Sequence, residues 1–328
     1  VLAVAPAGVS GFSAAAVLLY VSLLALVHEL TTFPLAFYRG YFLEQRYGLS
    51  SEPLGTWLRD HAKAAALTLV FAAAAAETVS FALSVTPAWW WLVASAVFVI
   101  GMMVLAKVAP LVLLPMFYTF TPLERESLRE RLIELSRRAG VPVLGIYEWS
   151  LGAKTRRANA ALVGTGTTRR IIVSDTLLAE YSDDEIEVIL AHEIAHHVHR
   201  DILRGLVAEA LLLVVACYAA SVALTTWGDA LGLRSPAEVT GLPLLLLAGG
   251  ATTVLATPVV NALSRANERR ADRYALTLTH QPAAFISAMK RLSAQNLAEE
   301  RPSRVALWLF HTHPPIDQRI DVAREFIQ

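Results

Sequence analysis

The chain has 328 residues, of which 55% are hydrophobic and only 17% are charged, and its mean hydropathy is +0.49. These values are typical of a membrane protein and exclude an ordinary soluble enzyme of this length. The formal net charge is zero and the chain has no basic tail, so nothing suggests a nucleic-acid partner. The single cysteine, Cys217, can form no disulfide within the chain.

Five segments are long and apolar enough to cross a bilayer. In chain order they are residues 10–38, 62–85, 89–116, 202–227 and 242–263. A buried helix of a soluble protein could imitate one such segment but hardly all of them. The sequence therefore predicts a mainly α-helical, multi-pass membrane protein with a transmembrane helix bundle.

The basic residues predict which loops face the cytoplasm. Arg39, Arg46, Arg59 and Lys63 follow the first apolar segment, and many Lys and Arg follow the third and the fifth, whereas the other loops hold only Arg234. By the positive-inside rule, the three basic segments are cytoplasmic and residue 1 lies on the other side. Because the chain begins with Val rather than Met, we expect a signal sequence or further spans before residue 1.

Between the third and fourth spans the sequence predicts a small cytoplasmic unit. Residues 122–139 have the apolar spacing of an amphipathic helix. Residues 145–149, 158–163 and 170–173 are typical of strands, and a glycine- and threonine-rich turn joins the last two as a hairpin. A further helix is expected to begin near Ser182, with three acidic residues in its first turn, and to run on into the membrane.

That helix carries the most informative motif of the chain, HEIAH at residues 192–196. His192 and His196 project from one helix face and can hold one metal ion, and Glu193 points beside the open coordination position where a water binds. This is the arrangement of a zinc hydrolase. The alternative is a pair of surface histidines without a metal. His197 and His199 fall off the ligand face and are interpreted as flanking surface residues.

A catalytic zinc needs a third protein ligand, and Glu268 is the best candidate. Asp272 lies one helical turn further on and could accept a hydrogen bond from the outer ring nitrogen of either ligand histidine. The alternative is a solvated helix in which both carboxylates pair with Arg269, Arg270 or Arg273. Since Glu268 lies a few residues beyond the fifth span, both ligand-bearing helices place the metal just inside the cytoplasmic membrane boundary.

Taken together, the motifs resemble those of the M48 metallopeptidases, and within them the Ste24-type CAAX prenyl proteases. The similar segments are EQRYGLS at 44–50, FTPL at 120–123, KTRRANAALVG at 154–164, RIIVSDTLL at 170–178 and HPP at 313–315. The resemblance implies that Asn159 and His313 contact the scissile peptide and help to stabilise its oxyanion. On local grounds alone, Asn159 could merely satisfy a turn and His313 could cap a loop.

Two features depart from the family pattern. Arg157 and Ala158 stand where the family commonly has His and Ser before the asparagine, which puts an inherited substrate preference at this strand in doubt. The family pattern also has seven spans around a large chamber, and this chain has the equivalent of the last five. Either two spans precede residue 1, or the chamber is more open in this protein.

The sequence thus predicts an integral-membrane zinc metalloendopeptidase, similar to the CAAX proteases, with one Zn²⁺ per chain. Zinc held by His192, His196 and Glu268 activates a water, and Glu193 takes its proton and delivers it to the leaving amine. The partners are the bilayer and a peptide or protein substrate, lipidated or membrane-associated. Two alternatives stay open: an HtpX-like quality-control protease, and a zinc-binding membrane scaffold without turnover. The bacterial inner membrane or an ER-type membrane is the expected location.

The expected domain division follows the spans. It has three transmembrane helices at 1–118, a catalytic region with a zincin-type unit and a small β-hairpin or sheet at 119–200, two spans at 201–263, and a C-terminal region at 264–328. Polar residues inside the spans are Glu29, Glu77, Lys107 and Glu209. Either they form ion pairs in a dry bundle, or they face a water-filled chamber beneath the zinc, as the Ste24 resemblance implies.

Overall fold

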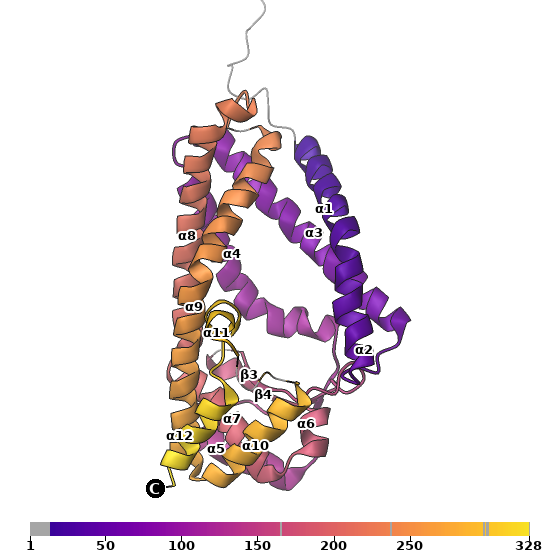
Figure 1. The fold of residues 1–328 in the computed structure, drawn as a ribbon, viewed down its shortest axis with the longest axis vertical. Coiled ribbons are helices and arrows are strands. Elements are labelled where there is room, and N and C mark those ends of the chain that lie inside the picture. Colours follow the sequence, from indigo (N-terminus) through magenta and orange to yellow (C-terminus); the bar gives the residue numbers. More distant parts are fainter. Residues whose placement is uncertain (1–13, 165, 237, 298, 300–301, 328) are drawn as a thin grey trace, which may run out of the picture. The chain divides into compact units, whose positions relative to one another are not determined.

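The computed structural model describes residues 14–164, 166–236, 238–297, 299 and 302–327. Within them, five helical segments are long and apolar enough to cross a membrane, which confirms the predicted number of spans (Figure 1). They are α1 (Ala14–Phe37), which continues through the π-helix η1 (Tyr38–Leu43) into α2 (Glu44–Arg46), then α3 (Leu54–Val85), α4 (Trp90–Val112), α8 (Asp201–Trp227) and α9 (Leu242–Thr279).

The chain forms two compact units built from alternating segments. Of the described residues, the first unit takes 14–41, 54–105 and 206–256, and the second takes 42–53, 106–205 and 257–327. Long helices therefore contribute residues to both units, since α4, α8 and α9 each cross a boundary.

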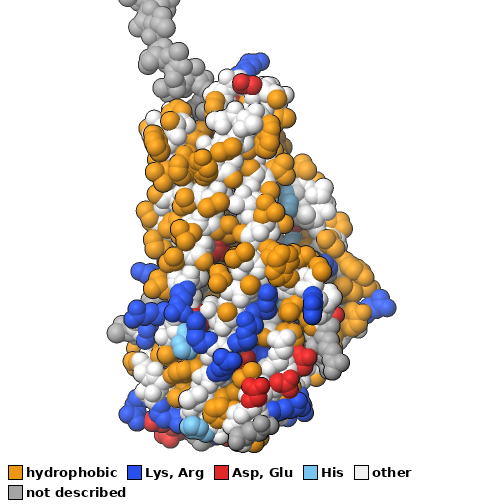
Figure 2. Space-filling model, turned by 60° about the vertical axis from the view of Figure 1, so that its left-hand side comes forward, with side chains coloured by type: hydrophobic (Ala, Val, Ile, Leu, Met, Phe, Trp, Pro, Cys, Tyr) orange, Lys and Arg blue, Asp and Glu red, His pale blue; other side chains and the backbone are white. Residues whose placement is uncertain are grey.

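The first unit is a helix bundle whose outer surface is apolar, as a bilayer requires (Figure 2). Its main core joins α3, α4 and α8 through Leu83, Trp90 and Leu224, and a smaller core joins α1 to α3 through Val21 and Ala76. Between α1, α3, α8 and α9 lies a cavity of about 600 Å³, lined almost entirely by apolar side chains.

The polar residues of the spans differ in their surroundings. Glu29 of α1 lies 2.6 Å from Nε2 of His61 on α3, so this carboxylate has a partner that the sequence analysis did not name. One carboxylate oxygen of Glu77 is buried with no hydrogen-bond partner among the described residues. Lys107 and Glu209 are exposed and form no ion pair with any described residue. For Lys107 and Glu209, the alternative of ion pairs in a dry bundle is therefore not observed in the described part of the chain.

The second unit contains a four-stranded mixed sheet with the strand order β1-β2-β4-β3. Its strands are β1 (Phe120–Pro122), β2 (Ile146–Trp149), β3 (Ala160–Val163) and β4 (Arg170–Ser174). The predicted hairpin is present, because β3 and β4 pair antiparallel, and β4 also pairs parallel to β2. Since β3 is at one edge, one side of this strand has no strand partner among the described residues.

Five helices contribute buried residues to the core around this sheet: α5 (Glu126–Arg138), α6 (Asp175–Glu180), α7 (Asp183–Val198), α10 (Pro282–Gln295) and α12 (Ile316–Glu325), together with the last turns of α9. Helix α11 (Arg304–Phe310) has no buried residue. Fully buried residues such as Leu132, Ile171, Leu190, Leu276 and Phe285 come from five different elements, so one apolar core fixes the sheet, α7 and the surrounding helices together.

The predicted amphipathic helix at 122–139 is partly wrong. Its first residue, Pro122, ends strand β1, where Thr121 and Pro122 pair with Glu148 and Tyr147 of β2, and the helix begins only at Glu126. Proline is tolerated there because β1 is an edge strand, so its missing N–H breaks no ladder. The apolar face that the spacing predicted is nevertheless real, since Leu128, Leu132 and Leu135 are fully buried.

The predicted continuation of the HEIAH helix into the membrane is also wrong. Helix α7 ends at Val198, and Arg200 adopts a left-handed conformation with φ of 57° before α8 begins at Asp201. A left-handed residue after the last turn is a common way to end a helix, but the residue is usually glycine. The break turns the chain so that Asp201 faces back toward α7.

The helix that contains the fifth predicted span is longer than that span. Helix α9 does not end near Leu263 but continues to Thr279, so it carries Glu268 and Asp272 on the same unbroken helix as the apolar segment. Pro258 lies inside it without ending it.

We expect position 200 to tolerate glycine and to reject valine. A left-handed conformation costs a non-glycine residue roughly 1–2 kcal/mol, and a β-branched side chain raises this further. Arg200→Val should therefore lower the unfolding midpoint in detergent by several degrees, and Arg200→Gly should leave it unchanged or raise it. Arg269→Val, at an exposed position within α9, is the control. Equal midpoints for Arg200→Val and this control would contradict the assigned backbone conformation.

Candidate metal centre

Helix α7 is a stable platform because its start is well capped and one side is buried. The Ser182 hydroxyl accepts a hydrogen bond from the Glu185 N–H, and the Glu185 carboxylate accepts one from the Ser182 N–H, which forms a capping box. Ile186, Leu190 and Ile194 are fully buried in the core that the sheet and α10 share. The neighbouring face of the helix, with the HEIAH side chains, is thereby held in a fixed orientation.

The structure brings the three predicted ligands together. Nε2 of His192 lies 3.2 Å from one carboxylate oxygen of Glu268, and Nε2 of His196 lies 3.4 Å from the other. Donor atoms of all three side chains lie within 4.8 Å of one another. Ligands of a tetrahedral ion with bonds of about 2.0 Å are themselves about 3.3 Å apart, so this set fits a divalent metal.

Each ligand histidine is held from behind by a carboxylate. Nδ1 of His192 lies 2.9 Å from Asp272, the residue that the sequence analysis proposed for this role. Nδ1 of His196 lies 3.0 Å from Asp201, which the sequence analysis missed. Such contacts hold a proton on Nδ1, so that Nε2 is the nitrogen of each ring that can bind a metal once the ring is neutral.

Two arginines complete this arrangement. Arg319 of α12 is only 8% exposed and donates hydrogen bonds of 2.9 and 2.6 Å to the two oxygens of Asp272. Arg270 donates to Asp201. The alternative in which Glu268 and Asp272 are solvated and pair with arginines of their own helix is not observed, because both carboxylates are buried against histidines. Arg319 has a weak sequence signal: it shares the buried face of α12 with Ile320 and Ala323.

A polar stripe on α9 positions the C-terminal part of the site. Asn261, Arg265, Glu268 and Asp272 follow one another at helical spacing and all are buried. The Asn261 side chain donates to the Leu309 carbonyl at 2.8 Å, and the Arg265 guanidinium donates to the His311 carbonyl at 2.7 Å. The helix that supplies the third ligand therefore also holds α11 and the segment before His313.

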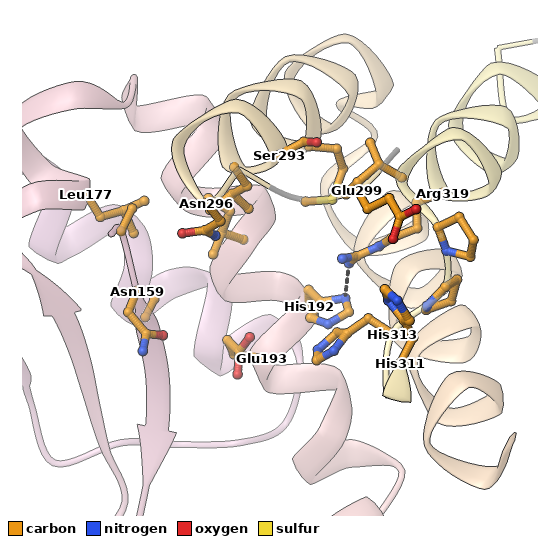
Figure 3. A pocket seen from close by; sticks show the side chains of 18 residues that line it. Asn159, Leu177, His192, Glu193, Ser293, Asn296, Glu299, His311, His313 and Arg319 are labelled. Atoms are coloured by element: carbon orange, nitrogen blue, oxygen red, sulfur yellow. Dashed lines mark hydrogen bonds between the residues drawn. The ribbon is translucent and has the colours of Figure 1, made fainter. Parts of the chain in front are cut away.

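Asn159 and His313 both line a pocket of about 400 Å³ over the ligand cluster, together with Glu193 (Figure 3). Nε2 of His313 lies 3.4 Å from Glu268. The main chain of Asn159 is tied to Ser174, which leaves its side chain at the pocket. In Figure 3, Glu193 and His192 lie between Asn159 on one side and His313 on the other. These residues therefore surround one space, and their roles remain predictions.

His197 and His199 are not simple surface residues. Both are partly buried, and Nε2 of His197 lies 2.9 Å from the Leu162 carbonyl of β3. Burial lowers the pKa of the His197 imidazole, which is therefore neutral at physiological pH. The ring of His199 packs edge-on against Tyr274, with the centroids 5.4 Å apart. Neither histidine belongs to the ligand cluster, as predicted, but both have packing partners and neither is freely exposed.

Comparison with known protein families shows which family has this arrangement of residues. A model of peptidase family M48 matches residues 122–327, which include the three ligands, Glu193, Asn159 and His313. The chain belongs to peptidase family M48. A second model, described as CAAX prenyl protease N-terminal with five membrane helices, matches residues 9–119, whose described part holds α1, α3 and α4.

Relatives of this M48 peptidase match over nearly the whole chain. An uncharacterised metalloprotease of Bacillus subtilis is 28% identical over 312 residues, or 93% of this chain and 72% of the relative. CAAX prenyl protease 1 of Saccharomyces cerevisiae is 26% identical over 327 residues, or 92% and 71%. The solved structure of S. mikatae Ste24p matches with a TM-score of 0.84 at 21% identity, over 97% of this chain and 78% of that one. The predicted family and fold class are confirmed: the chain is a Ste24-like, multi-pass membrane metalloprotease.

In the metal-free protein, the surrounding carboxylates raise the pKa of both ligand imidazoles. Burial alone would lower the pKa of His192, but its hydrogen bonds with Asp272 and Glu268 outweigh burial and raise the pKa to about 9. The pKa of His196 is raised in the same way, with Glu268 and Asp201 opposing the effect of burial. A metal would thus replace protons that the surrounding carboxylates hold in the metal-free protein.

We therefore expect metal binding to release protons. Below pH 9, His192 is protonated in the metal-free protein, and its Nε2 must lose a proton before it can bind a metal. The apparent metal affinity should rise with pH up to about 9, and calorimetric titrations in two buffers of different ionisation enthalpy should detect proton release at about pH 7.5. Asp272→Ala should reduce the number of protons released. Metal binding without any proton release would contradict the assigned state of His192.

Loss of the third ligand should empty the site. Two imidazoles alone make an incomplete site, so Glu268→Ala should lose most of the metal that the wild type retains through purification. Elemental analysis measures this directly. Glu299→Ala, which removes a carboxylate from the same pocket but not from the ligand cluster, is the matched control and should keep its metal. Equal metal content in both variants would point to another third ligand.

Proposed function

We propose that the protein is a zinc metalloendopeptidase of the membrane, with zinc held by His192, His196 and Glu268. The observation that carries the proposal is the convergence of these three donors next to a pocket that His192 and Glu193 line. Zinc bound there would lower the pKa of a water molecule and polarise the scissile carbonyl. The division into membrane segments and catalytic regions that the sequence predicts is part of the same proposal.

Glu193 is the proposed general base. It follows the first ligand directly, lines the pocket, and is not one of the three side chains that form the ligand cluster. Burial raises the pKa of Glu193, and a carboxylate with a raised pKa accepts a proton more readily at neutral pH. It would take the proton of the attacking water and then deliver it to the leaving amine.

His313 and Asn159 are the proposed hydrogen-bond donors to the substrate. The Thr312 hydroxyl lies 2.9 Å from Nδ1 of His313 and can donate to it. That bond leaves the ring proton on Nε2, the nitrogen nearer the ligand cluster, where a developing oxyanion would accept it. From the other side of the pocket, the Asn159 amide can hold the peptide.

An extended substrate would bind as an added strand along β3. This strand is at the edge of the sheet, and Ala158, Asn159 and Ala160 line the pocket. Main-chain hydrogen bonds of this kind supply affinity independently of the substrate sequence. They would present the scissile bond to Glu193 and the ligand cluster.

For the substrate class we propose a lipidated or membrane-associated peptide similar to those of the CAAX proteases, cut at the cytoplasmic side. The match of residues 9–119 to the CAAX protease N-terminal model favours this over the HtpX-like alternative, and membership of a peptidase family disfavours a scaffold without turnover. The apolar cavity among α1, α3, α8 and α9 is suited to a substrate with a hydrophobic group. A water-filled chamber around Glu77 remains part of the proposal.

The decisive experiment compares two substrates on the purified, reconstituted protein. One is a prenylated CaaX peptide, and the other is an unprenylated fragment of a membrane protein. Faster cleavage of the prenylated peptide supports the CAAX-like function, and preference for the fragment supports the quality-control alternative. Failure to cut either substrate, in a preparation with full metal content, would reject both proteolytic proposals.

Glu193→Gln should keep zinc and lose about 99% or more of peptidase turnover. The amide preserves the shape of the side chain but cannot accept the proton, and general-base catalysis contributes about 10²–10⁴-fold. Turnover of a fluorogenic peptide and zinc content are measured on the same preparation. A variant that kept a tenth of wild-type turnover would show that another group is the base.

His313→Ala should bind zinc normally and lower kcat more than it raises KM. An oxyanion donor acts mainly in the transition state, and loss of one such donor commonly costs about 10²–10³ in kcat. His311→Ala, which removes another imidazole that lines the same pocket, is the control. A pure KM effect would reassign His313 to substrate positioning.

A further inference from the structure

His197 makes a contact that neither metal binding nor the proposed proton transfers require. Its Nε2 lies 2.9 Å from the Leu162 carbonyl oxygen. Because a carbonyl can only accept, Nε2 carries the ring proton and donates it. The residue directly after the second ligand thus binds the main chain of the edge strand on which the substrate is proposed to pair.

The register of the sheet shows which side of β3 this bond occupies. Asn159 faces β4, since its carbonyl accepts from the Ser174 N–H at 2.9 Å. In an antiparallel pair, successive residues direct their N–H and C=O groups alternately toward the partner and away from it. Ala161 and Val163 therefore also face β4, and Ala160 and Leu162 face outward. The carbonyl that His197 occupies is one that an added strand would use.

The pocket ends at the same place. Ala158, Asn159 and Ala160 line it, whereas Leu162 does not. Ala160 and Leu162 are two residues apart, or roughly 7 Å along a strand. Two independent observations, the hydrogen bond and the extent of the pocket, therefore mark the same end of the available edge.

We propose that His197 is a positioning residue that limits substrate pairing on β3 to the segment ending at Ala160. This inference rests on the proposed strand addition. A substrate finds an outward N–H and C=O at Ala160, but two residues further on the acceptor is already occupied by the imidazole. The enzyme would then bind only a short stretch of the substrate main chain on this side of the scissile bond. Substrate residues beyond this stretch would make no main-chain hydrogen bonds with β3.

The test uses a reporter peptide and a series of derivatives that each carry one N-methylated residue. N-methylation removes a single main-chain donor, so its effect on kcat/KM maps where the substrate pairs. In the wild type, we expect a loss of about fivefold at the residue opposite Ala160 and no loss two residues further on. In His197→Ala, the second position should become sensitive by a similar factor, chiefly in KM, because pairing away from the scissile bond contributes uniform binding.

Two further variants separate positioning from a structural role. His197→Gln supplies an amide donor and should restore the wild-type methylation profile. His199→Ala removes an imidazole at the end of the same helix, which packs against Tyr274 rather than β3, and should leave the profile unchanged.

Three results would overturn the inference. One is an identical methylation profile in the wild type and His197→Ala. Another is a uniform fall in kcat in His197→Ala with no change in the profile, which would make the bond a structural tie between α7 and β3. The third is a loss of kcat/KM in the wild type when the substrate residue opposite Leu162 is N-methylated. This measurement uses the wild type alone, so it does not depend on the folding of any variant. Insensitivity at every position in the wild type would instead reject strand addition itself.

Discussion

The contact of Glu268 with the two imidazoles is the interaction on which the rest of the site depends. It joins α9 to α7, two helices that are far apart in the sequence and that also meet through the Asp272–His192 pair and through apolar core residues. Because Glu268 lies within a polar stripe on α9, the helix that reaches α7 also fixes the segment before His313. The ligand cluster and one wall of the pocket are therefore set by a single rigid element.

The site also balances its own buried charge. Two carboxylates stand behind the ligand imidazoles, and each has an arginine partner: Arg319 for Asp272 and Arg270 for Asp201. A buried carboxylate without such a partner would be strongly destabilising. With the arginine present, each carboxylate has a charged partner and holds its imidazole in one orientation. The four residues form two similar carboxylate–arginine pairs, one from α12 and α9 and one from α8 and α9.

Local patterns of the sequence were sufficient for much of the fold and for the candidate site. The spacing of His192, Glu193 and His196 follows from helix geometry alone, and the apolar runs indicated all five long helices. Glu268 could be proposed because a carboxylate pair at helical spacing followed the last apolar run. The polar stripe that marks α9 as continuous was present in the sequence, but only Glu268 and Asp272 were interpreted, and Asn261 and Arg265 were not.

What the sequence could not predict depends on backbone turns and distant contacts. Asp201 reaches His196 only because Arg200 adopts a left-handed conformation, and an arginine gives no sign of this, as a glycine would. Arg319 and Asp272 are 47 residues apart, so no local spacing relates them. Pro122 was predicted to begin a helix. Its pairing with Tyr147 of β2 is a contact between residues far apart in the sequence, and local spacing does not reveal it. The roles of Asn159 and His313 rest on family resemblance and on their position at the pocket.

The bond between His197 and Leu162 has a consequence for assembly as well. Exposed sheet edges are templates on which identical chains can stack, and natural proteins keep such edges short or blocked. Here both edges are small: β1 has three residues and ends in a proline, and β3 has four residues with one outward carbonyl occupied. The sheet can receive a short peptide beside the metal-binding residues, but it offers too little free edge for a second copy of the protein to continue it. The His197 imidazole would thus also disfavour self-association of the enzyme in the bilayer through the strand that is proposed to bind the substrate.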